Sequence, residues 1–164
     1  MIVVADTSVL LNLCRVAEED LLWQLYGTVA APQSVRDEFE RAAIAYPRFS
    51  SLIFPNFIQI HPPGRPLKAW LPNASLDPGE SDAIALVLEL QADLLLIDER
   101  KGRQVAAELG LCFSGILGVL IQAKNRGLVS DVRAVLRRLR EEAGFFLSEK
   151  HLQDALRLAG ESQS

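Results

Sequence analysis

The chain has 164 residues, a formal net charge of −4, 49% hydrophobic residues and 23% charged residues. This composition is typical of an ordinary globular protein and excludes disordered, collagen-like and large multidomain classes. A chain of this length buries roughly two-thirds of its unfolded surface, so we expect one domain over residues 1–164 without a disulfide or structural zinc. Cys14 and Cys112 form no Cys-x-x-Cys pair, and we expect both to be reduced and packed.

No part of the sequence approaches the ~18 consecutive apolar residues that a membrane helix requires. Glu89, Gln91 and Asp93 interrupt the richest apolar stretch. The first residues contain no basic segment and reach Asp6 too soon for a signal peptide. We therefore expect a cytoplasmic protein with no membrane partner.

Charge is distributed unevenly along the chain. Residues 1–98 carry 6 basic and 13 acidic side chains, residues 99–140 carry 9 and 3, and residues 141–164 carry 2 and 5. The net charge alone therefore gives no argument for nucleic-acid binding, but the basic segment at residues 99–140 offers a local site for a polyanion.

Short apolar runs alternate with longer amphipathic runs, which predicts a three-layer α/β/α domain with a central, mostly parallel sheet. Strands are expected at residues 2–5, 28–31, 94–97 and 111–113, with an edge strand at residues 57–60 inside a proline-rich connection, residues 55–73. Helices are expected at residues 33–43, 78–91, 99–110, 115–127, from a cap at Ser130 onward, and at residues 149–159 within a C-terminal segment, 148–160.

Asp6 and Asp98 each follow an apolar strand directly. The carboxyl ends of parallel strands meet at one edge of the sheet, so we expect the two carboxylates to face the same crevice. The alternative is that each aspartate only caps the following helix, a common role for this residue.

Three further acids lie on predicted helices. Glu38 lies at the margin of the apolar stripe of its helix and can reach inward, although a solvated helix acid is the alternative. Glu80 belongs to the capping box Asp77-Pro78-Gly79-Glu80, which explains it structurally as the partner that bonds back to the cap. Asp82 has no such role and precedes small apolar residues, where an unpaired carboxylate is costly.

Together these five acids form an all-oxygen set suited to Mg²⁺ or Mn²⁺, which can activate water for attack on a phosphodiester. No phosphate-binding loop or dinucleotide-binding glycine pattern is present, and the segment after Asp6 lacks the second aspartate of haloacid-dehalogenase phosphatases. His61 and His151 have no triad partner in the sequence and are expected at the surface.

The sequence resembles PIN-domain ribonucleases of the VapC-like toxin type, and a bacterial and archaeal subfamily of PIN domains in particular. The resemblance covers nearly the whole chain. It rests on residues 4–10 (VADTSVL), 32–40, 76–86 (LDPGESDAIAL), 96–103 (LIDERKGR) and 115–120 (GILGVL).

The resemblance implies that Asp6, Glu38, Asp82 and Asp98 are the catalytic acids, with Glu80 as a further metal ligand. Ser8 is the implied hydroxyl near the metal. It also implies a Mg²⁺- or Mn²⁺-dependent ribonuclease that leaves 5′-phosphate and 3′-hydroxyl ends. A homodimer and a small cognate antitoxin are the implied protein partners. Many relatives carry Glu at position 82, so the choice between Glu80 and Asp82 stays open.

Basic residues follow Asp98 at the expected active edge, and we expect Arg100, Lys101 and Arg103 to bind RNA. A second basic series, Arg133, Arg137 and Arg140, is explained at least as well by a solvated helix face. Two other functions remain open: a catalytically silent module that binds RNA or protein, and a receiver-like domain phosphorylated on one strand-end aspartate.

Overall fold

Five parallel strands form the central sheet of the computed structural model, which describes residues 1–62 and 64–161. Their order is β3-β2-β1-β4-β5, and every adjacent pair is parallel. The strands are β1 (Val3–Ala5), β2 (Val29–Pro32), β3 (Ile58–His61), β4 (Leu94–Leu96) and β5 (Phe113–Ser114). All five expected strands are present, displaced by no more than two residues at either end.

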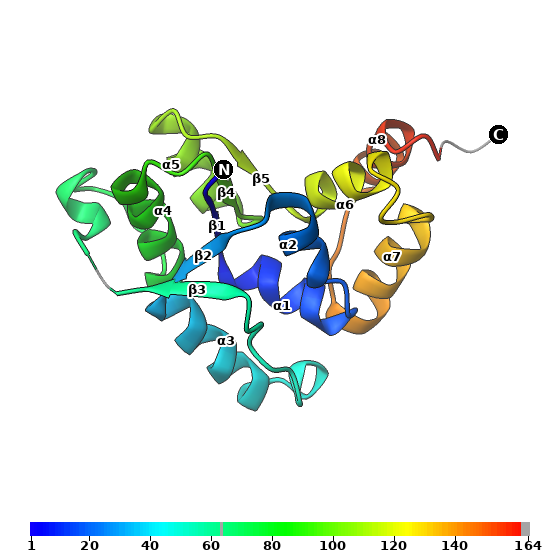
Figure 1. The fold of residues 1–164 in the computed structure, drawn as a ribbon, viewed down its shortest axis with the longest axis horizontal. Helices are drawn as coiled ribbons and strands as arrows, with labels where there is room; N and C mark the ends of the chain where they lie inside the picture. The colour runs from blue at the N-terminus through cyan, green and yellow to red at the C-terminus, as the bar shows by residue number, and fades with distance from the viewer. Residues whose placement is uncertain (63, 162–164) are drawn as a thin grey trace.

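Helices connect the strands and cover both faces of the sheet (Figure 1). Short 3₁₀ turns lie at Pro47–Phe49 and Leu67–Ala69, and α7 continues into a wider helical turn at Leu139–Ala143. The α-helices are α1 (Thr7–Arg15), α2 (Asp20–Tyr26), α3 (Gln33–Ala45), α4 (Pro78–Leu90), α5 (Arg100–Glu108), α6 (Ile116–Asn125), α7 (Val132–Arg138) and α8 (Glu149–Leu158).

Alternate residues of β1 enter two separate hydrophobic cores. Val3 and Ala5 pack with residues of α1, α2, α3, α6, α7 and α8, whereas Val4 packs with residues of α4 and α5. Successive side chains of a strand point to opposite faces of the sheet, so a strand covered on both faces contributes to both cores. The chain is therefore a three-layer α/β/α structure, as predicted.

The strand order places the predicted acids at a change of direction in the sheet. From β1 the chain moves first toward β2 and β3, then crosses back to β4 and β5. Ala5 of β1 pairs with Leu96 of β4, so Asp6 and Asp98 follow neighbouring strands. Ligands of open α/β sheets bind at such a point, outside the carboxyl ends of the strands.

Two local predictions are wrong. Asp131, not Ser130, caps α7, because its side chain accepts a hydrogen bond from the Ala134 backbone N–H at 3.0 Å. Cys14 is buried, but Cys112 is exposed, since it precedes the edge strand β5, whose outer side no further strand covers. Across residues 1–62 and 64–161, no helix is long and apolar enough to cross a membrane.

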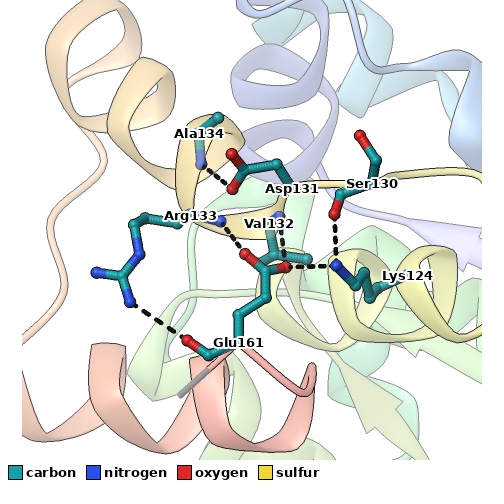
Figure 2. A network of polar contacts seen from close by, with 7 residues as sticks. All are labelled: Lys124, Ser130, Asp131, Val132, Arg133, Ala134 and Glu161. Atoms are coloured by element: carbon teal, nitrogen blue, oxygen red, sulfur yellow. Dashed lines mark hydrogen bonds and ion pairs between the residues drawn. The ribbon is translucent and has the colours of Figure 1, made fainter. Parts of the chain in front are cut away.

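Glu161 holds the end of α8 against the start of α7 (Figure 2). Its carboxylate accepts hydrogen bonds from the backbone N–H groups of Val132 (2.7 Å) and Arg133 (3.2 Å) and lies 3.2 Å from the Lys124 ammonium. These contacts fix the C-terminal helix beside α6 and α7 in Figure 1.

Candidate functional site

Asp6 is a buried acid with an unsatisfied oxygen. It stands at the N-terminus of α1, but its side chain makes no capping hydrogen bond, and only 2% of the residue is exposed. Oδ1 has no hydrogen-bond partner among the described residues. Burial, followed by the nearby carboxylates of Glu80, Asp77 and Glu38, raises the pKa of Asp6 to about 8. A buried acid with a raised pKa and an unpaired oxygen is a candidate ligand for a cation.

Glu38 reaches inward from α3, as its position at the margin of the apolar stripe predicted. Its Oε2 accepts a hydrogen bond from the Thr7 hydroxyl at 2.8 Å, and its Oε1 accepts one from the Gly79 backbone N–H at 2.8 Å. The carboxylate therefore joins the first turn of α1 to the first turn of α4. Gly79 permits this approach, because a Cβ at that position would collide with the carboxylate.

Glu80 and Asp82 occupy different sides of α4. Glu80 is 6% exposed, and burial together with the carboxylates of Asp77, Glu99 and Glu38 raises its pKa to about 7. Asp82 is half-buried and lines a small pocket with Gln33 and Arg65. Two positions along a helix turn a side chain through about 200°, so the two acids leave α4 in different directions.

The expected capping box forms only in part. The Asp77 side chain accepts a hydrogen bond from the Glu80 backbone N–H at 2.9 Å, as predicted. Among the described residues, the reciprocal bond from the Asp77 backbone N–H to the Glu80 carboxylate does not form. Glu80 is instead turned toward the acids at the sheet edge, and its cap role does not account for its burial.

Asp98 makes its hydrogen bonds and its ion pair with residues of α6 and α5, not with the other candidate acids. Both of its carboxylate oxygens lie 3.3 Å from the Ile116 backbone N–H, and Oδ1 lies 3.6 Å from the Arg103 guanidinium. Burial raises the pKa of Asp98, although these two contacts oppose the shift. Under the alternative interpretation Asp98 would cap the helix that directly follows it, but that helix, α5, has Glu99 at its N-cap, and the Asp98 carboxylate engages the first turn of α6 instead. Its position nonetheless adjoins Asp6 across β1 and β4.

The remaining predicted residues fall into two groups. Ser8 is half-buried in the first turn of α1, and its hydroxyl oxygen is buried with no hydrogen-bond partner in the described part of the chain. Arg100 and Lys101 are exposed at the start of α5, whereas Arg103 is anchored beside Asp98. All four lie near the carboxyl edge of β1 and β4.

A preassembled metal cage is absent: within residues 1–62 and 64–161, no three Asp, Glu, His or Cys side chains are positioned to hold a metal ion. The chemistry of the donors still suits a hard divalent cation, since every candidate ligand is an oxygen. Asp6 carries a buried, unpaired oxygen, and Glu80 is a second buried acid whose charge acts on Asp6. The chemistry of these residues therefore fits a Mg²⁺ or Mn²⁺ ion.

Sequence reasoning missed Thr7 and Gly79, which orient Glu38. Thr7 forms its bond with a residue 31 positions away, which no local pattern shows. Gly79 gave a signal, because glycine is a poor helix former and stands here inside the first turn of a helix. Glu80 precedes the buried Ala83 and Ile84 by three and four residues, but Asp82 precedes the buried Ala85 and Leu86 in the same way, so helical periodicity does not choose between the two acids.

A family model described as PIN domain matches residues 2–161. The chain therefore belongs to the PIN-domain family, whose members are generally nucleases. Searches of curated proteins and of solved structures gave no significant match.

Proposed function

We propose that this protein is an endoribonuclease that uses Mg²⁺ or Mn²⁺ to hydrolyse RNA phosphodiesters. The observation that carries the proposal is the pair Asp6 and Glu80, two buried carboxylates that share the crevice at the reversal of the sheet. Burying such acids without a cation is costly, and a bound divalent ion removes that cost. Membership in the PIN-domain family supports the same class of reaction.

The metal would be held by Asp6 and Glu80, with Glu38 and Asp98 as the further acids of the site. When bound, the ion lowers the pKa of a water molecule and polarises the phosphodiester. The sequence did not decide whether Glu80 or Asp82 is the closer metal ligand, and this assignment chooses Glu80. Asp98 would contribute a carboxylate oxygen to the ion, and Arg103, which lies 3.6 Å from that carboxylate, would pair with a phosphate of the substrate.

Glu38 contributes orientation as well as charge. The hydrogen bonds from Thr7 and Gly79 occupy one lone pair on each of its oxygens and fix the plane of the carboxylate. A carboxylate held in this way can bind an ion or a water molecule without losing further side-chain entropy. Ser8, whose hydroxyl is buried nearby on α1, would add a hydrogen bond beside the metal.

The resemblance to VapC-like toxins extends the proposal to biology. We propose a toxin that a small cognate antitoxin silences, a homodimeric assembly and a cytoplasmic location, all on that resemblance alone. Within the described residues, exposed apolar side chains such as Ile44 and Ile53 give protein partners a surface to cover.

A second candidate is a catalytically silent PIN domain that binds RNA or protein. One observation favours it: Asp98 engages the start of α6, and no three acids of the described residues are arranged around a common point. In such a protein the acids would only cap helices or link one helix to another by hydrogen bonds.

Cleavage of a mixed pool of single-stranded RNA separates the two candidates. The purified protein is incubated with Mg²⁺ or Mn²⁺, with EDTA, and as the Asp6→Asn, Asp98→Asn double variant. The proposal expects metal-dependent cleavage with 5′-phosphate products that EDTA and the variant both abolish. Equal inactivity of the native protein and the variant, with RNA binding retained by both, would establish the silent module.

A further inference from the structure

A pocket of about 460 Å³ opens beside Asp98, between β5, α6 and the segment that leads into α8. Its wall combines one acid of the candidate site with a guanidinium, an imidazole and three phenyl rings. These side chains are Asp98, Arg103, His151, Phe113, Phe145 and Phe146. The pocket therefore meets the candidate site at Asp98 and is built largely by residues from the C-terminal part of the chain.

Arg103 is fixed at one side of this pocket. Its Nε donates a hydrogen bond to the Ile97 carbonyl oxygen at 2.9 Å, and its guanidinium carbon lies 5.6 Å from the centre of the Phe113 ring. The side chain nevertheless remains 38% exposed. A guanidinium oriented in advance but still open to solvent is well suited to bind a phosphate group.

Phe146 lines the same pocket and is 75% exposed. Its neighbours Phe145 and Leu147 are partly buried and pack against the main hydrophobic core. Because these two residues anchor the segment, the ring between them is directed outward. A phenyl ring held in this way, next to a fixed cation, offers a flat surface on which a nucleobase can stack.

His151 stands on the first turn of α8, at the edge of the pocket. Its Nδ1 lies 2.9 Å from the Ser148 hydroxyl, which also accepts a hydrogen bond from the His151 backbone N–H at 3.2 Å. The Ser148 contact fixes the ring and leaves the other ring nitrogen for a ligand. The surface position of His151 is as predicted, and the residue lines the same pocket as Asp98.

A second pocket, of about 540 Å³, shares the lining residues Phe145 and Leu147 with the first. Arg133, Arg137 and Arg140 line one of its walls, and Glu141 and Glu149 are also present. Within residues 1–62 and 64–161, neither Arg137 nor Arg140 forms an ion pair. Unpaired cations along a groove favour a polyanion over a protein partner.

We propose that the two pockets bind consecutive nucleotides of a single-stranded RNA. Phe146 stacks on the base next to the cleaved phosphate, Arg103 and His151 bind the phosphate of that nucleotide, and Arg137 and Arg140 bind the phosphates beyond it. The choice of RNA as the ligand rests on the proposed function. The site itself rests on the arrangement of the cations and the exposed ring.

Fluorescence anisotropy with a labelled single-stranded RNA tests the site in EDTA, where no cleavage is expected. Phe146→Ala should weaken binding on the order of tenfold, the size expected for one stacked base, whereas Phe146→Trp should restore it. Leu158→Ala removes an exposed apolar side chain of α8 that does not line the pocket and should leave the affinity unchanged. His151→Ala and Arg137→Ala should each weaken binding and reduce its salt dependence.

An RNA with one abasic position gives the sharper comparison. Moving that position along the strand should reveal one site at which the native protein loses affinity and Phe146→Ala loses no more, because the ring and the base are partners. Such binding without cleavage in Mn²⁺ would support this site and refute the proposed nuclease. Three results would overturn the site. The native protein could cleave RNA while Phe146→Ala binds it with unchanged affinity, or the losses from Phe146→Ala and from the abasic position could add at every position. The third result is a variant that changes only the oligomeric state.

Discussion

The Glu38 carboxylate and the Gly79 backbone N–H, 41 residues apart, are joined by a hydrogen bond of 2.8 Å. This bond ties α3 to the first turn of α4, directly before Glu80. It is possible only because residue 79 lacks a side chain. One glycine thus sets the distance between two of the candidate acids.

Gly79→Ala should therefore damage the site more than the fold. The new methyl group collides with the Glu38 carboxylate, which must swing away and break its bond to the backbone. We expect a loss of about 1–3 kcal/mol in the free energy of unfolding and a large loss of cleavage activity. Chemical denaturation and cleavage rates measure the two effects.

Thr7→Val provides the matched comparison for Gly79→Ala. It removes the other hydrogen bond to Glu38 without adding volume, so its cost should be about 0.5–1.5 kcal/mol, with a smaller effect on activity. If Gly79→Ala were as active and as stable as the native protein, Glu38 would have no positioning role.

Asp6→Asn should stabilise the metal-free protein at alkaline pH. Because the pKa of Asp6 is raised from 3.8 to about 8, the folded protein retains a proton that the unfolded chain has lost between these values. The free energy of unfolding of the native protein therefore falls as the pH rises through this interval. Removing the carboxylate should recover about 1–3 kcal/mol at pH 8, or roughly 3–10 °C in Tm.

Divalent ions should make the native protein more stable than Asp6→Asn at pH 8. Mn²⁺ should raise the Tm of the native protein at pH 8 and have little effect on Asp6→Asn. Asp82→Asn, which changes an acid on the other side of α4, should keep the native pH profile and the native response to Mn²⁺. A native Tm that rises between pH 5 and pH 8 without metal would contradict the assignment of Asp6 as a buried, uncompensated acid.

Glu161→Gln should loosen the C-terminal helix. Partial burial favours a raised pKa, but the hydrogen bonds from Val132 and Arg133 and the Lys124 ammonium outweigh it and lower the pKa of Glu161. The carboxylate therefore stabilises the fold above its ordinary pKa of 4.5, and this contribution is lost as the pH falls below that value. We expect a loss of about 1–2 kcal/mol at pH 7 that disappears in acid.

Asp154→Asn serves as the control for Glu161→Gln. It breaks an exposed ion pair with Arg157 on the same helix, and such pairs contribute little to stability. Equal Tm values for Glu161→Gln and Asp154→Asn at pH 7 would show that the network in Figure 2 does not hold α8 in place.

Local patterns predicted the fold well because each element carries its own signal. The apolar runs ending at Asp6 and Asp98, and the cap at Asp77, depend on neighbours in sequence. The sheet edge that collects the acids follows from the parallel order of the strands. The inward reach of Glu38 also follows from its place on the helix stripe.

The finer arrangement of the site depends on contacts across the fold. Whether Asp98 faces Asp6 or the start of α6 is decided by Ile116 and Arg103, which its own strand does not specify. The placement of His151 beside Asp98 depends on how α8 packs on the rest of the chain, since 53 positions of sequence separate the two residues. No periodicity in the sequence predicts that these two residues line one pocket.

The most direct test of the account compares the cleavage rates of Glu80→Gln and Asp82→Asn on one single-stranded RNA in Mn²⁺. Both changes neutralise one acid of α4, but only Glu80 is buried beside Asp6. We predict that Glu80→Gln lowers kcat at least 100-fold, on the order of the loss of one electrostatic contact to the reacting groups, and that Asp82→Asn stays close to the native rate. A larger loss of kcat for Asp82→Asn than for Glu80→Gln would contradict a metal site around Asp6 and Glu80.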